Sequence, residues 1–307
     1  MGVGVSGLGS MPMWLSVHPG GGSAYTVDMS GEGAVHAHSV SALSGALTPI
    51  NSQPSRGAGP CHLTALERFV LCANYAGGTI CVLPIEASGG LGPAVEYKDH
   101  GTTIGSGAGG HVRQDMAHPH QILLDPSGKY CFVPDLGTNK VHSYLWHPDS
   151  GALTEESELM LADGAGPRHM CFTPDGAHAF VLGELDNNVY VCSHVDGVLT
   201  VVQTLNSLLP GTEHATAGGG AEIIISPDGR FVYATIRGTC AVIEDPYPTN
   251  YAFNLIGALA RPPARQPAQL RAGCVRRRVC MWDTLRKLNV AACGVCLPAT
   301  RSDVCCG

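Results

Sequence analysis

Residues 223–234 read Ile-Ile-Ile-Ser-Pro-Asp-Gly-Arg-Phe-Val-Tyr-Ala, a short polar turn between two apolar runs. Proline presets the backbone φ, aspartate caps the turn and glycine adopts a positive φ, so this segment predicts a β-hairpin. The phrase recurs as Asp-Pro-Ser-Gly-Lys-Tyr at residues 125–130 and as Thr-Pro-Asp-Gly-Ala-His at residues 173–178. A degenerate copy, His-Pro-Gly-Gly, occupies residues 18–21. The chain therefore repeats one hairpin.

The spacing of these hairpins indicates the architecture. Pro126, Pro174 and Pro227 lie 48 and 53 residues apart. A hairpin repeated at about this period is typical of a β-propeller, in which each repeat supplies one four-stranded blade. Four units and the beginning of a fifth lie between residues 12 and 239. The sequence thus predicts an all-β propeller with about four to five blades.

Composition divides the chain into segments. Residues 1–239 carry 9 of the 18 Lys+Arg and 21 of the 25 Asp+Glu, whereas residues 240–307 have a balance of +5 and hold seven of the 13 cysteines. Strand alternation also ends near residue 240. We expect a flexible start at 1–11, the propeller at 12–239, and a divergent, disordered Cys/Arg/Pro-rich tail at 240–307.

Charge, cysteine usage and hydropathy limit the functional classes. The six cysteines before residue 240 fall mostly inside apolar runs and read as small buried hydrophobes, with no disulfide framework. The sequence has no transmembrane segment and no secretory signal, which predicts a cytoplasmic protein without a membrane partner. The propeller segment is acidic and the basic tail lacks interleaved aromatics, so no nucleic acid partner is expected.

Several phrases together resemble a known family. They are Gly57-Ala-Gly-Pro-Cys-His-Leu63, Ala73-Asn-Tyr75, His118-Pro-His120, Phe132-Val-Pro-Asp-Leu-Gly137, Gly166-Pro-Arg-His-Met170, Gly183-Glu-Leu185 and Ala221–Tyr233 with Arg237-Gly238. In order and spacing they resemble the bacterial-type 6-phosphogluconolactonases of the seven-bladed propeller lactonase family, which also includes carboxymuconate-cyclising enzymes. The resemblance covers about three quarters of the chain. It implies seven blades, so we expect a propeller truncated at both ends.

The resemblance also implies an active site in the central cleft. Carried over by motif, its catalytic residues are His120, Arg168, Glu184 and Arg237. His120 or Glu184 is expected to act as the general base toward water, and the two arginines to hold an anion or stabilise an oxyanion. The candidate substrate-binding residues are His118, His169 and Glu222. The structural alternatives are an Arg–Glu ion pair between blades, a Glu222–Arg237 pair, and repeat-level hydrogen bonding by His169.

Two groups of residues in the sequence contain side chains that can bind a metal ion. His111, His118 and His120 lie near Asp115 but share one glycine-rich segment, and the resembling family needs no metal. The Cys293-Gly-Val-Cys296 pattern is followed by Cys305 and Cys306 at a spacing too short for a zinc ribbon. No metal and no cofactor are therefore expected.

Three functions stay open at this point. The first is hydrolysis of a small anionic sugar lactone, 6-phosphogluconolactone to 6-phosphogluconate, in the oxidative pentose phosphate pathway. The second is a cyclase or lactonase that acts on a carboxymuconate-type diacid. The third is a propeller that serves as an interaction module without catalysis.

Overall fold

The protein is built from antiparallel sheets. The computed structural model describes residues 8–207, 219–237 and 254–260. Within these ranges the chain forms nineteen strands and no helix, and the strands assemble into four four-stranded sheets and one three-stranded sheet. The predicted all-β propeller with four to five blades is confirmed.

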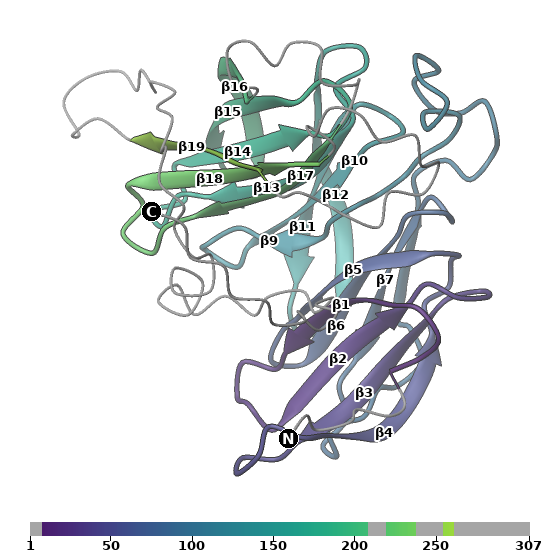
Figure 1. The fold of residues 1–307 in the computed structure, drawn as a ribbon. Coiled ribbons are helices and arrows are strands. Elements are labelled where there is room, and N and C mark those ends of the chain that lie inside the picture. Colours follow the sequence, from purple (N-terminus) through teal and green to yellow (C-terminus); the bar gives the residue numbers. More distant parts are fainter. Residues whose placement is uncertain (1–7, 208–218, 238–253, 261–307) are drawn as a thin grey trace, which may run out of the picture.

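Each sheet is contiguous in the chain, and its strands follow one another in order (Figure 1). The first sheet contains β1 (Pro12–Val17), β2 (Ser23–Asp28), β3 (Ala34–Val40) and β4 (Leu47–Pro54). The second contains β5 (Pro60–Ala65), β6 (Phe69–Asn74), β7 (Thr79–Pro84) and β8 (Glu96–Asp99). The third contains β9 (Leu123–Leu124), β10 (Tyr130–Asp135), β11 (Lys140–His147) and β12 (Ala152–Met160). The fourth contains β13 (Pro167–Phe172), β14 (His178–Gly183), β15 (Asn188–Val195) and β16 (Val198–Asn206). The fifth contains β17 (Gly220–Ile225), β18 (Phe231–Ile236) and β19 (Asn254–Ala260).

The fifth sheet extends past the predicted domain boundary. The sequence assigns residues 254–260 to the tail, whereas the structure pairs them antiparallel with β18 as β19. Residues 261–307, with the Cys293-Gly-Val-Cys296 pattern, lie outside the described residues, as do residues 1–7.

At the start of the described chain, the backbone N–H groups of Ser10 and Met11 donate to the Asp28 carboxylate, each at 3.0 Å.

The three clear turn copies close their hairpins in the same way. In each, the side-chain oxygen of the first turn residue accepts a hydrogen bond from the backbone N–H five residues later. The acceptors are Asp125, Thr173 and Ser226, and the donors are Tyr130, His178 and Phe231, at 2.8, 3.1 and 2.9 Å. The turn glycines Gly128, Gly176 and Gly229 have φ of 70°, 68° and 68°. The repeated phrase is therefore a hairpin, as predicted, and glycine supplies its left-handed residue.

The apolar core lies between consecutive sheets. The described residues form four buried clusters, and each joins the middle strands of two neighbouring sheets. In β6, for example, Val70 and Cys72 face the first sheet, whereas Phe69, Leu71 and Ala73 face the third. Because these strands are buried on both faces, their sequences read as continuous apolar runs. Five of the six cysteines in the described part are buried.

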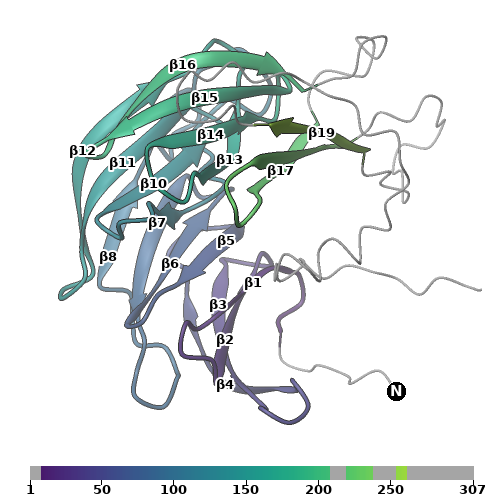
Figure 2. The ribbon, with the colours of Figure 1, turned by 90° about the vertical axis from the view of Figure 1, so that its left-hand side faces the viewer.

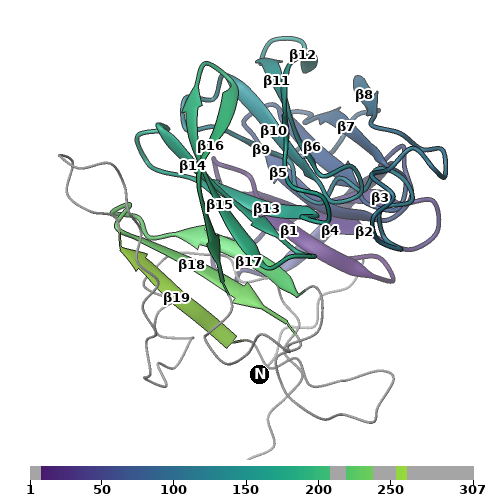
Figure 3. The ribbon, with the colours of Figure 1, turned by 90° about the horizontal axis from the view of Figure 1, so that it is seen from above.

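The five sheets follow one another in chain order along an arc (Figure 2). The first strands of neighbouring sheets contact each other, as β1 does β5 and β13 does β17, so these strands line the inner side of the arc. Seen from above, the fifth sheet lies beside the fourth (Figure 3). Among the described residues no helix is long and apolar enough to cross a membrane.

The turn geometry predicts a local stability effect. Gly128 has a φ of 70° and open space where a Cβ would be built, so a Gly128→Ala variant meets backbone strain and no steric clash. We expect the free energy of unfolding, measured by urea denaturation, to fall by about 1 kcal/mol. Gly128→Asn is the control, because asparagine tolerates the left-handed region better, and its loss is expected to be smaller. Equal losses in the two variants would contradict this explanation.

Candidate active site

The first strand of each sheet, called here the inner strand, has an extra residue near its start. This residue turns side chains toward the inner side of the arc. The pairing of the first two strands skips one residue between Pro12 and Trp14, between Pro60 and His62, and between Pro167 and His169. The fifth sheet has a similar irregularity between Gly220 and Ile223. In the third sheet the Pro119–Asp135 bridge is followed by one extra residue before β9. Such bulges redirect a side chain out of the regular alternation. They place Cys61, His120 and Arg168 at equivalent positions of three sheets.

A second layer comes from the residue that follows the second strand of each sheet. In four sheets its backbone N–H donates to the carbonyl of the residue just before the inner strand, and in the third sheet to the carbonyl just before the Pro119–Asp135 bridge. The donors Met29, Tyr75, Leu136, Glu184 and Arg237 bond to Met11, Gly59, His118, Gly166 and Gly219, over 2.7–3.0 Å. Three of these five positions carry an aromatic hydroxyl, a carboxylate and a guanidinium. The repeat therefore brings Tyr75, Glu184 and Arg237 to equivalent positions of three sheets.

Glu184 is the centre of a charged cluster. Its carboxylate is almost fully buried and forms an ion pair with each of three arginines. Arg113 Nη1 lies 2.8 Å from Oε1, Arg168 Nε lies 3.1 Å from Oε2, and Arg237 Nη2 contacts Oε1. Arg168 is fixed further because its Nη1 donates to the Ala221 carbonyl. We define these four charged side chains, Glu184 with Arg113, Arg168 and Arg237, as the arginine cluster.

The arginine cluster carries an excess of positive charge. Burial opposes ionisation of Glu184, but the guanidinium groups of Arg237, Arg168 and Arg113 outweigh it and hold the pKa of Glu184 below its usual range. With Glu184 ionised, three positive charges face one negative charge, which leaves a net charge of plus two. Three of the nine basic residues in the acidic segment 1–239 meet here. The cluster therefore suits a small anion.

His120 lies next to the arginine cluster. Its ring makes edge contacts with Tyr75 and His169, at centroid distances of 5.3 and 5.2 Å, and its Nδ1 lies 3.8 Å from Cys61 Sγ. Burial, together with the charge of Arg168, holds the pKa of His120 well below its ordinary value, so the imidazole is neutral at neutral pH. Burial also raises the pKa of Cys61 to about 12, so this residue stays a thiol and is no nucleophile.

His169 and Glu222 form a hydrogen-bonded pair beside His120. His169 Nδ1 lies 2.9 Å from Glu222 Oε1. The His169 ring also packs against His62 and Trp14, at centroid distances of 5.6 and 5.8 Å. Glu222 thus contacts His169, and Arg237 contacts Glu184 instead of Glu222.

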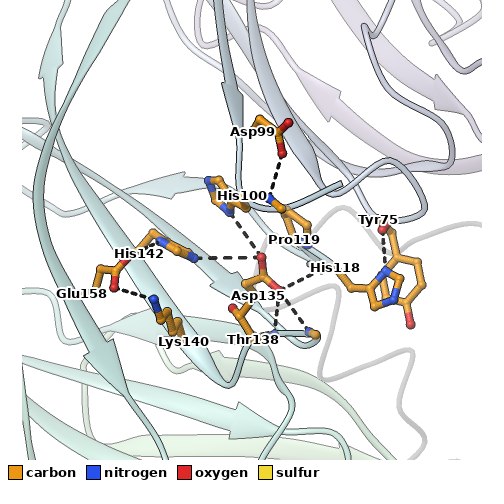
Figure 4. Close-up of polar contacts among 12 residues, drawn as sticks. Tyr75, Asp99, His100, His118, Pro119, Asp135, Thr138, Lys140, His142 and Glu158 are labelled. Atoms are coloured by element: carbon orange, nitrogen blue, oxygen red, sulfur yellow. Dashed lines mark hydrogen bonds and ion pairs between the residues drawn. The ribbon is translucent and has the colours of Figure 1, made fainter. Parts of the chain in front are cut away.

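His118 lies behind Tyr75. Its ring stacks on the Tyr75 ring at 4.5 Å, and its Nδ1 is 2.8 Å from the Tyr75 carbonyl (Figure 4). Its Nε2 is 3.1 Å from the Asp115 carboxylate. Both ring nitrogens therefore have partners within the protein, and His118 holds Tyr75 in place.

Arg168, Glu184 and Arg237 lie together in the structure with His120 near them, and their catalytic role stays a prediction. The structure adds two residues to this group that the sequence did not indicate. Arg113 comes from the long segment between β8 and β9, where no repeat fixes the path of the chain. Tyr75 stands in the quoted Ala-Asn-Tyr phrase, and comparison of the residues after each second strand would have found it. A groove of about 610 Å³ lies elsewhere, and none of the arginine cluster lines it.

Comparison with known proteins identifies the family. Residues 3–256 match the model of the lactonase, seven-bladed β-propeller family, and the chain belongs to this family. It is 32% identical to the 6-phosphogluconolactonase of Bacillus subtilis and 27% identical to that of Formosa agariphila, over 76% and 80% of its length. The periplasmic gluconolactonase of Pseudomonas aeruginosa superposes with a TM-score of 0.72 at 29% identity, over 85% of this chain and 70% of that one.

The chain spans only part of its curated relatives. It covers 66% of the Bacillus subtilis protein, 70% of the Formosa agariphila protein and 50% of the 6-phosphogluconolactonase of Pectobacterium carotovorum. The described residues form five sheets, whereas the family is described as seven-bladed.

The arginine cluster predicts a pH-dependent contribution to stability. Because the pKa of Glu184 is lowered by folding, its stabilising effect is complete above its ordinary value of 4.5 and is lost as pH falls below it. We expect Glu184→Gln to lower the free energy of unfolding by about 2 kcal/mol at pH 7. Breaking a fully buried ion pair costs more, but here Arg113 and Arg237 are partly exposed. This difference from wild type is expected to shrink between pH 5 and pH 3.

The measurement is urea denaturation of both proteins across that pH range. Glu156→Gln, which removes an exposed carboxylate on β12, is the matched control. A Glu184→Gln difference that stays constant down to pH 3 would show that the carboxylate gains no stabilisation from the arginines.

Proposed function

We propose that this protein hydrolyses a phosphorylated sugar lactone, with 6-phosphogluconolactone as substrate and 6-phosphogluconate as product. The arginine cluster carries the proposal, because an excess of guanidinium groups around one buried carboxylate suits an anionic substrate. The names of the relatives support the same chemistry. We also propose that the protein acts in the oxidative pentose phosphate pathway and that it does so in the cytoplasm.

The arginines supply the electrostatic part of the reaction. Arg113 and Arg237 are partly exposed, with 40% and 33% of their side chains accessible, whereas Arg168 is more deeply buried at 16%. The two exposed groups are positioned to hold the phosphate bidentately. Arg168 lies beside His120 and is assigned to the oxyanion that forms when the lactone carbonyl is attacked.

Of the two candidate bases, we assign His120. Both carboxylate oxygens of Glu184 are paired with guanidinium groups that stabilise its ionised form, so it is a poor proton acceptor. His120 is neutral and half-buried. The positive charges that lower its pKa are partly neutralised when an anion binds, which makes the imidazole a stronger base in the complex. Glu184 is then a positioning residue for the arginines.

The proposed reaction follows from these roles. His120 accepts a proton from water while the water oxygen attacks the lactone carbonyl, which forms a tetrahedral oxyanion beside Arg168. When the oxyanion collapses, the bond from the carbonyl carbon to the ring oxygen breaks. The proton held by His120 is then transferred to the leaving ring oxygen, and the product is the open-chain carboxylic acid. His169, fixed by Glu222, packs against His120 and holds its ring in place.

Turnover by the purified chain tests the proposal. We expect hydrolysis of 6-phosphogluconolactone above the uncatalysed rate. His120→Ala and Arg168→Ala are each expected to lower kcat/KM by about 100-fold or more. Arg230→Ala, which removes an exposed arginine of the fifth-sheet hairpin, is the matched control and is expected to stay near wild type. If wild type is no faster than Arg168→Ala, this polypeptide is not a lactonase.

The same assay separates the two alternatives from the sequence analysis. A carboxymuconate-type lactone replaces the phosphosugar in a parallel series, and faster turnover of that compound would favour the diacid enzyme. A second experiment measures binding of the product instead of turnover. Binding of 6-phosphogluconate is measured by calorimetry with wild type, Arg237→Ala and Arg113→Ala. We expect each substitution to weaken binding about ten-fold, since a charge-assisted hydrogen bond contributes about 1.5–3 kcal/mol. If wild type neither binds 6-phosphogluconate nor hydrolyses either lactone, the result favours the interaction module.

A further inference from the structure

Two histidines and one aspartate, none of them part of the arginine cluster, point toward one another (Figure 4). His100 follows β8, Asp135 ends β10, and His142 lies in β11. His100 Nδ1 is 3.3 Å from Asp135 Oδ2, and His142 Nε2 is 4.0 Å from the same oxygen. The accessible fractions of the three side chains are 2%, 0% and 10%. One potential ligand atom of each lies within 4.8 Å of the other two.

His142 presents an unpaired nitrogen to this cluster. Its Nδ1 lies 3.1 Å from the Glu158 carboxylate, which only accepts hydrogen bonds, so Nδ1 carries the hydrogen. Glu158 is held in turn by Lys140 Nζ, at 2.7 Å. His142 Nε2 therefore offers a lone pair, and it has no hydrogen-bond partner among the described residues. A buried acceptor that faces the Asp135 carboxylate, another acceptor, is unfavourable unless a cation lies between them.

The other two groups are fixed in the same way. His100 Nε2 lies 2.7 Å from the Tyr144 hydroxyl, which leaves Nδ1 directed at Asp135 Oδ2. The second oxygen of Asp135, Oδ1, already accepts from the backbone N–H groups of His118 at 2.8 Å and Gly137 at 3.0 Å. Only Oδ2 is thus directed at the histidines. Outer partners that orient each ligand in this manner are characteristic of metal sites.

We propose that His100 Nδ1, Asp135 Oδ2 and His142 Nε2 bind a Zn²⁺ ion. Ligands about 2.0–2.1 Å from a tetrahedral zinc ion lie about 3.3 Å apart. This spacing matches the 3.3 Å between His100 Nδ1 and Asp135 Oδ2, and His142 Nε2, now 4.0 Å from Oδ2, must move closer when the ion binds. Two imidazoles and one carboxylate form a ligand set that zinc accepts. His100 and His142 both line the groove of about 610 Å³, so the fourth position is open to water.

An ion at this position would link two neighbouring sheets. His100 follows the last strand of the second sheet, whereas Asp135 and His142 belong to the third, so the ion joins two sheets. Asp135 also binds the backbone of His118 and pairs with Pro119, directly before His120. The zinc site therefore braces the segment that carries the proposed base, but the inference does not depend on lactonase activity.

Metal binding by the full chain tests the inference. Accessible thiols are alkylated first, because cysteine thiolates also bind zinc. The protein is then stripped with a chelator and dialysed against Zn²⁺, and bound zinc is measured by elemental mass spectrometry. We expect one zinc ion per chain in wild type, and at least ten-fold weaker binding in His142→Ala. His147→Ala, a less buried histidine on the same strand, is the matched control and is expected to bind like wild type.

A second variant keeps the test decisive if His142→Ala does not fold by circular dichroism. Glu158→Gln leaves all three ligands in place but removes the carboxylate that orients His142, and we expect it to weaken zinc binding by about 10- to 100-fold. We also expect Zn²⁺ to raise the Tm of wild type more than that of Glu158→Gln. The inference is overturned if wild type takes up no stoichiometric zinc, or if the folded variants bind zinc as tightly as wild type.

Discussion

The middle strands of the second, third and fourth sheets are apolar on both faces, and this constraint organises the molecule. A sheet of this kind cannot expose either face to water, so it is stable only between two neighbours. Val70 and Cys72 of β6 contact the preceding sheet while Leu71 contacts the following one, and β14 is divided in the same way. Stacking sheets in this manner brings their first strands together along one side of the arc. The inner ends of those strands are the natural place for a site that several sheets share.

The candidate site uses the repeat without being repeated itself. The same extra residue and the same hydrogen bond occur in successive sheets, but the side chains at those positions differ from sheet to sheet. Cys61, His120 and Arg168 occupy one position, and Tyr75, Glu184 and Arg237 the other. The backbone thus supplies fixed, equivalent directions, and substitution at each supplies the chemistry. A buried carboxylate among three guanidinium groups keeps those groups ordered and still leaves a net positive charge for an anion.

Much of the fold was predictable, whereas the candidate site was predictable only in part and its function stays a prediction. The Pro-Asp-Gly turns are local, so their hairpins could be read directly, and counting them anticipated four full sheets and part of a fifth. His120, Arg168, Glu184 and Arg237 were carried over from the motifs of the resembling family, and the repeat explains why residues so far apart in the chain lie near one another. Arg113 was missed because it lies on the segment between β8 and β9, which belongs to no repeat. The His100–Asp135–His142 cluster was missed because its members come from three separate elements.

By itself, the sequence determined the strands, their hairpins and the order of the sheets, since these depend on turn chemistry and on apolar runs a few residues long. It also determined which charged residues stand at strand ends. Only the tertiary structure decided that three arginines meet at one carboxylate and that β19 joins the last described sheet. It alone decided that His142 directs an unpaired nitrogen at Asp135. Those outcomes depend on how separate sheets and the long segment 100–118 pack together, and no local pattern specifies distances between residues so far apart in the chain.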